Sequence, residues 1–259
     1  MTKRTHAPSF VRSVGAVVCL LLIVGCGGTD RAAPDAQAPS RSLDSLYRAA
    51  IADARTAEPS EIVTTLTPIA PYNDDLVWRQ RRDATRRVLV VTWGDRTTLP
   101  AATPGDTLTA PSDVWVTAAP HLQEFCRALD RTGSALDRRL AQRLGLPPDV
   151  TYDRFIELWV RPAALVRPCP DPEVTDRECE RRAPVPARHA AVSEDHRAWF
   201  RALKRTSYGP DGYPFTGLGY TYDWHPGTDE VGPSEFVLRT GQQAIVHAIQ
   251  PTAAYCRPS

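Results

Sequence analysis

The amino-acid sequence predicts an α+β domain with a mostly antiparallel sheet, about four helices and two disulfides. Segments with the apolar spacing of helices and segments with strand character are mixed along the chain, without the regular strand–helix–strand alternation of a parallel sheet. Short turns rich in Gly and Pro separate several of the strand-like segments. Four cysteines lie between residues 126 and 256, and this even number is typical of two disulfides.

Two of the predicted helices have clear N-terminal signals. Residues 43–54 follow Ser42 and place their Leu, Tyr, Ile and Ala side chains at helical spacing. Residues 193–204 begin at Ser193 and carry acids in the first turn, where the helix dipole favours negative charge. We expect both serines to be N-caps.

The region 119–145 predicts two further helices that share one apolar face. Gly133 interrupts this run because glycine disfavours a helix interior. Gly145 is followed closely by two prolines, so we expect the second helix to end there.

Seven segments have strand character. Residues 155–160 are apolar at both alternating positions, which predicts a central strand and makes Glu157 unusual if it faces inward. Residues 235–249 predict a hairpin that turns near Gly241. The predicted strands are 76–78, 88–93, 112–117, 155–160, 217–224, 235–240 and 243–249.

The N-terminus has the features of an export signal. Residues 1–12 are basic and residues 13–25 carry no charge. The apolar run is shorter than the ~20 residues that a helix needs to cross a bilayer. The stretch Ile23-Val24-Gly25-Cys26 resembles the lipobox of bacterial lipoproteins. This resemblance implies that the signal peptide 1–25 is cleaved and that Cys26 receives a lipid, and two or more acyl chains give a stable membrane anchor.

The resemblance to lipoproteins covers only about the first 30 residues. It implies the following division of the chain. Residues 26–41 would comprise the lipidated Cys26 and a flexible tether rich in Gly, Ala, Pro and Ser, and residues 42–259 a single globular domain. Gly27 after the cysteine would favour the outer membrane in a Gram-negative host. An ordinary signal peptide whose cleavage site precedes a cysteine is the alternative.

The remaining cysteines predict the two disulfides. Cys169–Cys179 is favoured because the loop between them is short and contains proline, and Cys126–Cys256 then ties the C-terminus to a helix. A metal site is the rival, but no C-x-x-C occurs and the spacings do not match zinc modules. We therefore expect neither a metal nor a cofactor.

Charge and motifs exclude several function classes. The 31 basic and 30 acidic residues nearly balance, whereas nucleic-acid binding needs a concentrated basic face. Walker A, dinucleotide-binding, zinc-protease and nucleophile-elbow motifs are all absent from the sequence.

An aromatic segment and four polar residues are the candidates for function. Residues 208–224 hold six of the chain's aromatic residues, and Tyr213, Tyr220, Tyr222 and Trp224 are candidates for a ligand surface or, alternatively, for the core. Acid–base hydrolysis would require two carboxylates with a histidine. The candidates for that role are Glu157, His196, Asp223 and His225.

Taken together, these patterns predict a lipid-anchored, exported cell-envelope protein. Its domain is expected to bind an envelope component, such as a glycan, or a protein partner without catalysis. An envelope hydrolase acting on glycan or peptide near Glu157, His196 and Asp223 is the alternative.

The lipobox makes a direct prediction about localisation. Cys26→Ser removes the thiol that would carry the lipid, so we expect the protein to leave the membrane fraction and appear in the soluble exported fraction. Fractionation followed by immunoblotting measures this. A variant that stays membrane-bound would contradict the lipoprotein interpretation.

Overall fold

The structure is a computed structural model that describes residues 42–99, 102–182 and 192–258. The predicted lipobox and tether, with Cys26 and Gly27, lie outside these residues. The described residues belong to one compact unit, Arg41–Ser259. Within the described ranges, no helix has both the length and the apolar character needed to span a bilayer.

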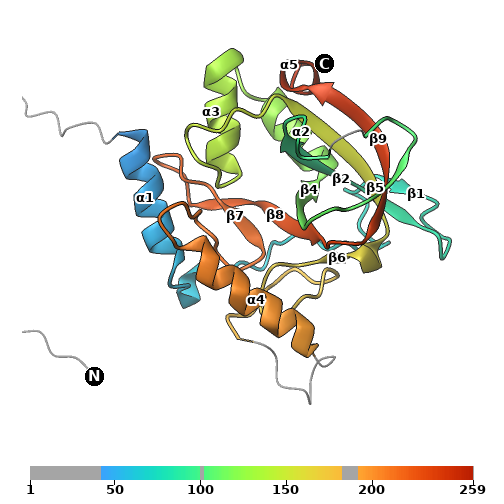
Figure 1. Ribbon diagram of the computed structural model, residues 1–259, viewed down its shortest axis with the longest axis horizontal. Coiled ribbons are helices and arrows are strands. Elements are labelled where there is room, and N and C mark those ends of the chain that lie inside the picture. Colours follow the sequence, from blue (N-terminus) through green and yellow to red (C-terminus); the bar gives the residue numbers. More distant parts are fainter. Residues whose placement is uncertain (1–41, 100–101, 183–191, 259) are drawn as a thin grey trace, which may run out of the picture. The chain divides into compact units, whose positions relative to one another are not determined.

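The predicted α+β fold with a mostly antiparallel sheet is confirmed (Figure 1). The strand order is β3-β9-β5-β2-β4-β8-β6, with β1 paired to β2 and β7 paired to β8, and every pairing is antiparallel. The segment predicted to be central is β5, which lies between β2 and β9. The strands are β1 Trp78–Arg79, β2 Arg87–Gly94, β3 Thr107–Thr109, β4 Val114–Ala118, β5 Arg154–Val160, β6 Leu165–Val166, β7 Tyr220–Tyr222, β8 Val231–Leu238 and β9 Gln243–Pro251.

The predicted hairpin over residues 235–249 is wrong. Strands β8 and β9 are consecutive in the chain, but three other strands separate them in the sheet order. The tight turn between them is closed by Gln242 N, which donates to Arg239 O. Its backbone also pairs with Ala110 rather than extending a ladder between the two strands. Because strands lie ~4.8 Å apart, so short a link requires the sheet to curl until β8 and β9 approach each other.

The helices match the predicted segments, and the short α5 adds a single turn near the C-terminus. The side chains of Ser42 and Ser193 accept hydrogen bonds from Ser45 N and His196 N, so both predicted N-caps are confirmed. Gly145 follows α3 with a φ of +66°, a conformation that favours glycine. The helices are α1 Leu43–Ala54, α2 Ala119–Arg127, α3 Gly133–Arg143, α4 Glu194–Ser207 and α5 Thr252–Tyr255, with 3-10 turns η1 Pro59–Glu61 and η2 Pro162–Ala164.

Strand β2 is buried on both faces because alternate residues enter two different cores. Val88 and Val90 belong to the core that also contains Phe236 of β8 and Val246 of β9. Leu89, Val91 and Trp93 belong to the core beneath α2, α3 and α5. Helix α2 packs on β2 and β4, while α5 packs on β5 and β9. The sheet is therefore a rigid layer that fixes the positions of α2 and β8.

Both predicted disulfides are confirmed. Cys126–Cys256 joins α2 to the C-terminal end of α5 across 130 residues, and Cys169–Cys179 closes a short loop. All four cysteines are buried. A disulfide typically contributes about 2–4 kcal/mol to stability, more for a longer loop if chain entropy dominates. The four hydrophobic cores and both disulfides lie within Arg41–Ser259, so we expect this unit to fold without the first 40 residues.

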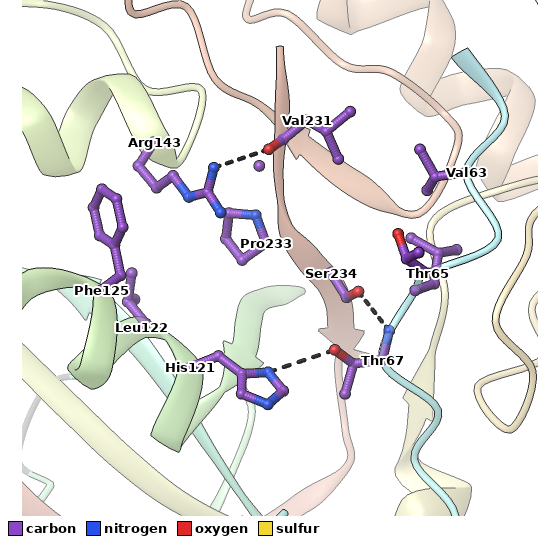
Figure 2. A pocket seen from close by; sticks show the side chains of 12 residues that line it. Val63, Thr65, Thr67, His121, Leu122, Phe125, Arg143, Val231, Pro233 and Ser234 are labelled. Atoms are coloured by element: carbon purple, nitrogen blue, oxygen red, sulfur yellow. Dashed lines mark hydrogen bonds between the residues drawn. The ribbon is translucent and has the colours of Figure 1, made fainter. Parts of the chain in front are cut away.

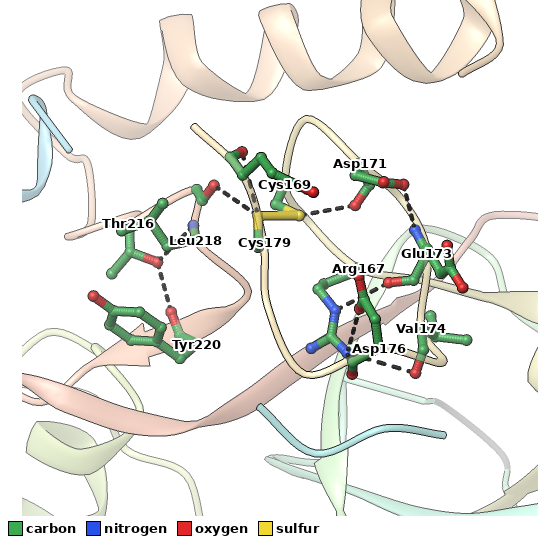
Figure 3. Close-up of a disulfide and its surroundings, with 12 residues drawn as sticks. Arg167, Cys169, Asp171, Glu173, Val174, Asp176, Cys179, Thr216, Leu218 and Tyr220 are labelled. Carbon is green, nitrogen blue, oxygen red and sulfur yellow. Dashed lines mark hydrogen bonds and ion pairs between the residues drawn. A yellow bond between two sulfur atoms is a disulfide. The ribbon is translucent and has the colours of Figure 1, made fainter. Parts of the chain in front are cut away.

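The buried side chain of Arg167 organises the disulfide loop from within (Figure 3). Its guanidinium donates to the carbonyl oxygens of Glu173 and Asp176 at 3.0 and 3.1 Å. Burial lowers the pKa of Arg167 to about 10, an effect that nearby carboxylates oppose. Gly219 is needed beside it because a Cβ there would lie 2.7 Å from Arg167 Cδ, and because its φ is +80°. The loop therefore depends on a cation enclosed by main-chain oxygens.

Glu235 of β8 is a buried acid near this guanidinium. Burial raises its pKa to about 8, and the charge of Arg167 only partly offsets that effect. The folded protein therefore holds a proton on Glu235 that the unfolded chain, with a pKa near 4.5, has released at neutral pH.

This proton makes stability fall with rising pH. The contribution of protonated Glu235 is complete below pH 4.5 and is lost as the pH rises through about 8. We expect Glu235→Gln to flatten the decline in urea midpoint between pH 5 and pH 8 and to be more stable than the unaltered protein at pH 8. The exposed Glu178→Gln is the matched control. An unchanged slope in Glu235→Gln would contradict the assignment.

Candidate functional site

The acid–base candidates lie in separate environments. Glu157 of β5 is buried, and burial raises its pKa, although His247 and Arg127 oppose the rise. His196 of α4 is buried with its Nε2 2.8 Å from the carbonyl oxygen of Cys169, and burial lowers its pKa. That contact requires Nε2 to carry the proton, as in a neutral histidine that fastens α4 to the disulfide loop.

Asp223 follows β7 and is fully buried, where it binds two arginines of α3. The backbone N–H of His225 donates to its carboxylate at 3.2 Å. In the described part of the chain, no hydrogen bond or ion pair joins Glu157, His196 and Asp223 to one another. The structure therefore does not bring the three residues together as a hydrolytic site.

The aromatic segment packs into the core rather than forming a ligand surface. Tyr220, Tyr222 and Trp224 are each at most 6% exposed, so their assignment to a ligand surface is corrected. Their polar atoms have the partners that the core alternative requires: Glu61 O, Asp53 Oδ2 and Leu146 O. Only the ring of Tyr213 among the four candidates is substantially exposed, at 38%.

A cavity of about 220 Å³ lies between α2, the end of α3 and β8 (Figure 2). Its wall is formed by one face of α2, by Arg143, by residues 231–234 of β8 and by side chains of the extended segment 63–67. The sequence analysis did not identify it, because its residues come from four distant segments and follow no local motif.

Arg143 is held at the wall of the cavity by the buried carboxylate of Asp223. Arg139 donates two hydrogen bonds to that carboxylate, at 2.9 and 2.8 Å, in a bidentate pair. Arg143 adds a third through Nη1 at 3.2 Å, and the same atom donates to Val231 O at 2.9 Å. Two guanidinium groups and one carboxylate leave one positive charge. Nε and Nη2 of Arg143 have no acceptor within the described residues, and the side chain is 26% exposed.

The C-terminal end of α3 is fixed against β7, which positions Arg143. The last carbonyl groups of a helix lack partners within the helix. Here the carbonyl of Gln142 accepts from Trp224 N, and that of Arg143 accepts from Thr221 Oγ1 at 2.8 Å. Gly232 of β8 allows this close packing, because a Cβ would lie 2.0 Å from Thr221 Oγ1 and 2.8 Å from Arg143 O.

The opposite wall of the cavity presents the polar side chains of His121, Thr67 and Ser234. Nδ1 of His121 lies 3.5 Å from Thr67 Oγ1, and Thr67 N donates to Ser234 Oγ at 2.8 Å (Figure 2). The lining contains Arg143 and His121 but no carboxylate. The cavity thus combines hydroxyl groups, a cation and apolar side chains.

A group of carboxylates lies beside a second, smaller cavity. Ligand oxygens of Asp53, Glu61 and Glu230 fall within 4.8 Å of one another. The hydroxyl of Tyr222 donates to Asp53, and burial raises the pKa of that hydroxyl. Exposed acidic groups are common without a metal, and we assign no ion to this one.

The chain matches no protein-family model, no curated protein and no solved structure.

Proposed function

We propose that this chain is an exported, lipid-anchored protein of the bacterial cell envelope that binds an envelope component or a protein partner without catalysis. The lipobox sequence ending at Cys26 supports the anchor, and the two disulfides of the domain support an oxidising compartment outside the cytoplasm. The tether 27–41 would separate the domain from the bilayer. Gly27 supports outer-membrane sorting if the host is Gram-negative.

One observation carries the binding function: the acid–base candidates are buried or already engaged in contacts, whereas Arg143 at the cavity still has donor atoms available. Glu157 is buried within the sheet, while His196 and Asp223 are engaged in contacts that hold helices in place. Arg143 is fixed in orientation at a cavity and keeps two donor atoms available. A cation that is fixed in orientation and keeps donor atoms available suits the recognition of a ligand better than proton transfer, because an arginine does not deprotonate in proteins.

Sedimentation with purified peptidoglycan tests this function. Peptidoglycan carries carboxylates on its peptides, so we expect the oxidised chain from Gly27 onward to sediment with it and to release neither sugar nor peptide. Arg143→Gln should weaken the affinity obtained from the sedimentation curve about tenfold, since a hydrogen bond to a charged group contributes strongly to binding. The control is Arg138→Gln, an exposed arginine on the same helix.

Release of soluble sugar or peptide would contradict the non-catalytic function. Absence of sedimentation would exclude peptidoglycan as the envelope component and leave a protein partner. If Arg143→Gln and Arg138→Gln had equal effects, we would conclude that peptidoglycan does not bind at the cavity.

A further inference from the structure

We infer that the cavity between α2, α3 and β8 binds a carboxylate that bears a short apolar group. The inference rests on the proposed binding function for its biological setting, and it does not depend on the lipid anchor.

The charge of the cavity selects an anion. Arg143 and His121 are the lining residues that can carry charge, and both are basic. Asp223 neutralises only one of the two arginines that contact it, so the cluster keeps one positive charge. A cationic ligand would find no carboxylate partner in this lining, and burying a charge without a partner is costly.

The geometry of the guanidinium group favours a planar anion. Nη1 of Arg143 is committed to Asp223 and Val231, which fixes the plane of the group. The two atoms without an acceptor, Nε and Nη2, form one edge of the guanidinium. Such an edge offers two parallel N–H donors, the arrangement that receives a carboxylate in a bidentate pair.

The rest of the lining selects an apolar group of limited size. Cavities for drug-sized ligands have volumes of roughly 300–1,000 Å³, whereas this one has about 220 Å³. A compact acid, or the terminal carboxylate of a peptide with its last side chain, suits this volume. The apolar lining residues are Val63, Leu66, Leu122, Phe125, Val231 and Pro233.

The hydroxyl groups of the cavity can form hydrogen bonds with polar atoms that lie next to the carboxylate of the ligand. Ser234 Oγ accepts from Thr67 N at 2.8 Å and still has its own proton to donate. Thr65 is exposed at the entrance. An acylated amino acid presents an amide next to its carboxylate, which makes it a suitable probe.

The test compares two probes that differ only in their terminal group. N-acetyl-leucine carries the carboxylate, and N-acetyl-leucinamide replaces it with a neutral amide. We would titrate each into the isotopically labelled, oxidised chain from Gly27 onward and follow the NMR spectrum. We expect the acid to bind at least about tenfold more tightly than the amide and to shift the signals of Gly232 and His121. Inorganic phosphate, an anion without an apolar group, should bind more weakly than the acid.

Three variants locate the site. Arg143→Gln should weaken binding of the acid about tenfold, while the exposed Arg138→Gln leaves it unchanged. Thr65→Phe places a bulky ring at the entrance from an exposed position, so it should block binding without removing a buried contact. This variant keeps the inference testable if Arg143→Gln fails to fold.

Several results would overturn the inference. Equal affinity for the acid and the amide would exclude recognition of the carboxylate, and phosphate binding as tight as the acid would exclude the apolar group. Binding that is insensitive to Thr65→Phe, or no binding by either probe, would exclude the cavity. None of these outcomes affects membrane anchoring through Cys26, which fractionation tests separately.

Discussion

The buried ion pair between Asp223 and the arginines of α3 is the interaction on which the rest of the site depends. A fully buried carboxylate is tolerated only when opposite charge and hydrogen bonds surround it, and Arg139 supplies both in a bidentate pair. Arg143 donates to Oδ2 of the same carboxylate, and the backbone N–H of His225 donates to Oδ1. One acid thus fixes the end of α3 against β7 and leaves a second guanidinium at the cavity with donors available.

The scaffold makes this arrangement rigid from two directions. The sheet buries β2 on both faces and holds α2 above it, and the Cys126–Cys256 disulfide fastens α2 to the C-terminus. On the other side, Arg167 and the Cys169–Cys179 disulfide order the loop between the two cysteines, and the guanidinium of Arg167 lies over the ring of Phe236 of β8 at 5.1 Å. A cavity whose walls come from α2, α3 and β8 therefore has little freedom to change shape, which favours a ligand of defined form.

Local patterns were sufficient to predict the four longer helices, seven of the nine strands, the caps at Ser42 and Ser193 and the two disulfides, but not the short strands β3 and β6. The elements, the caps and Cys169–Cys179 depend on neighbouring residues or on a short loop, whereas Cys126–Cys256 spans 130 residues and was predicted as the remaining pair. The separation of β8 from β9 in the sheet could not be predicted, since adjacency in the chain favours a hairpin and only the curled sheet and the contact with Ala110 disfavour one. The cavity was also missed: Arg143, His121 and Ser234 become neighbours only in the fold. Asp223 was predicted as an acid–base candidate, whereas the structure shows its carboxylate bound to two arginines of α3.

A double-mutant cycle with Asp223→Asn and Arg143→Gln tests most directly whether Asp223 positions Arg143 for binding. The quantity measured is the affinity for N-acetyl-leucine in each single variant and in the double variant, with folding verified by NMR. If Asp223 acts through Arg143, Asp223→Asn weakens binding in the unaltered protein and has no further effect once Arg143 is replaced. Independent, additive effects of the two substitutions would contradict this account.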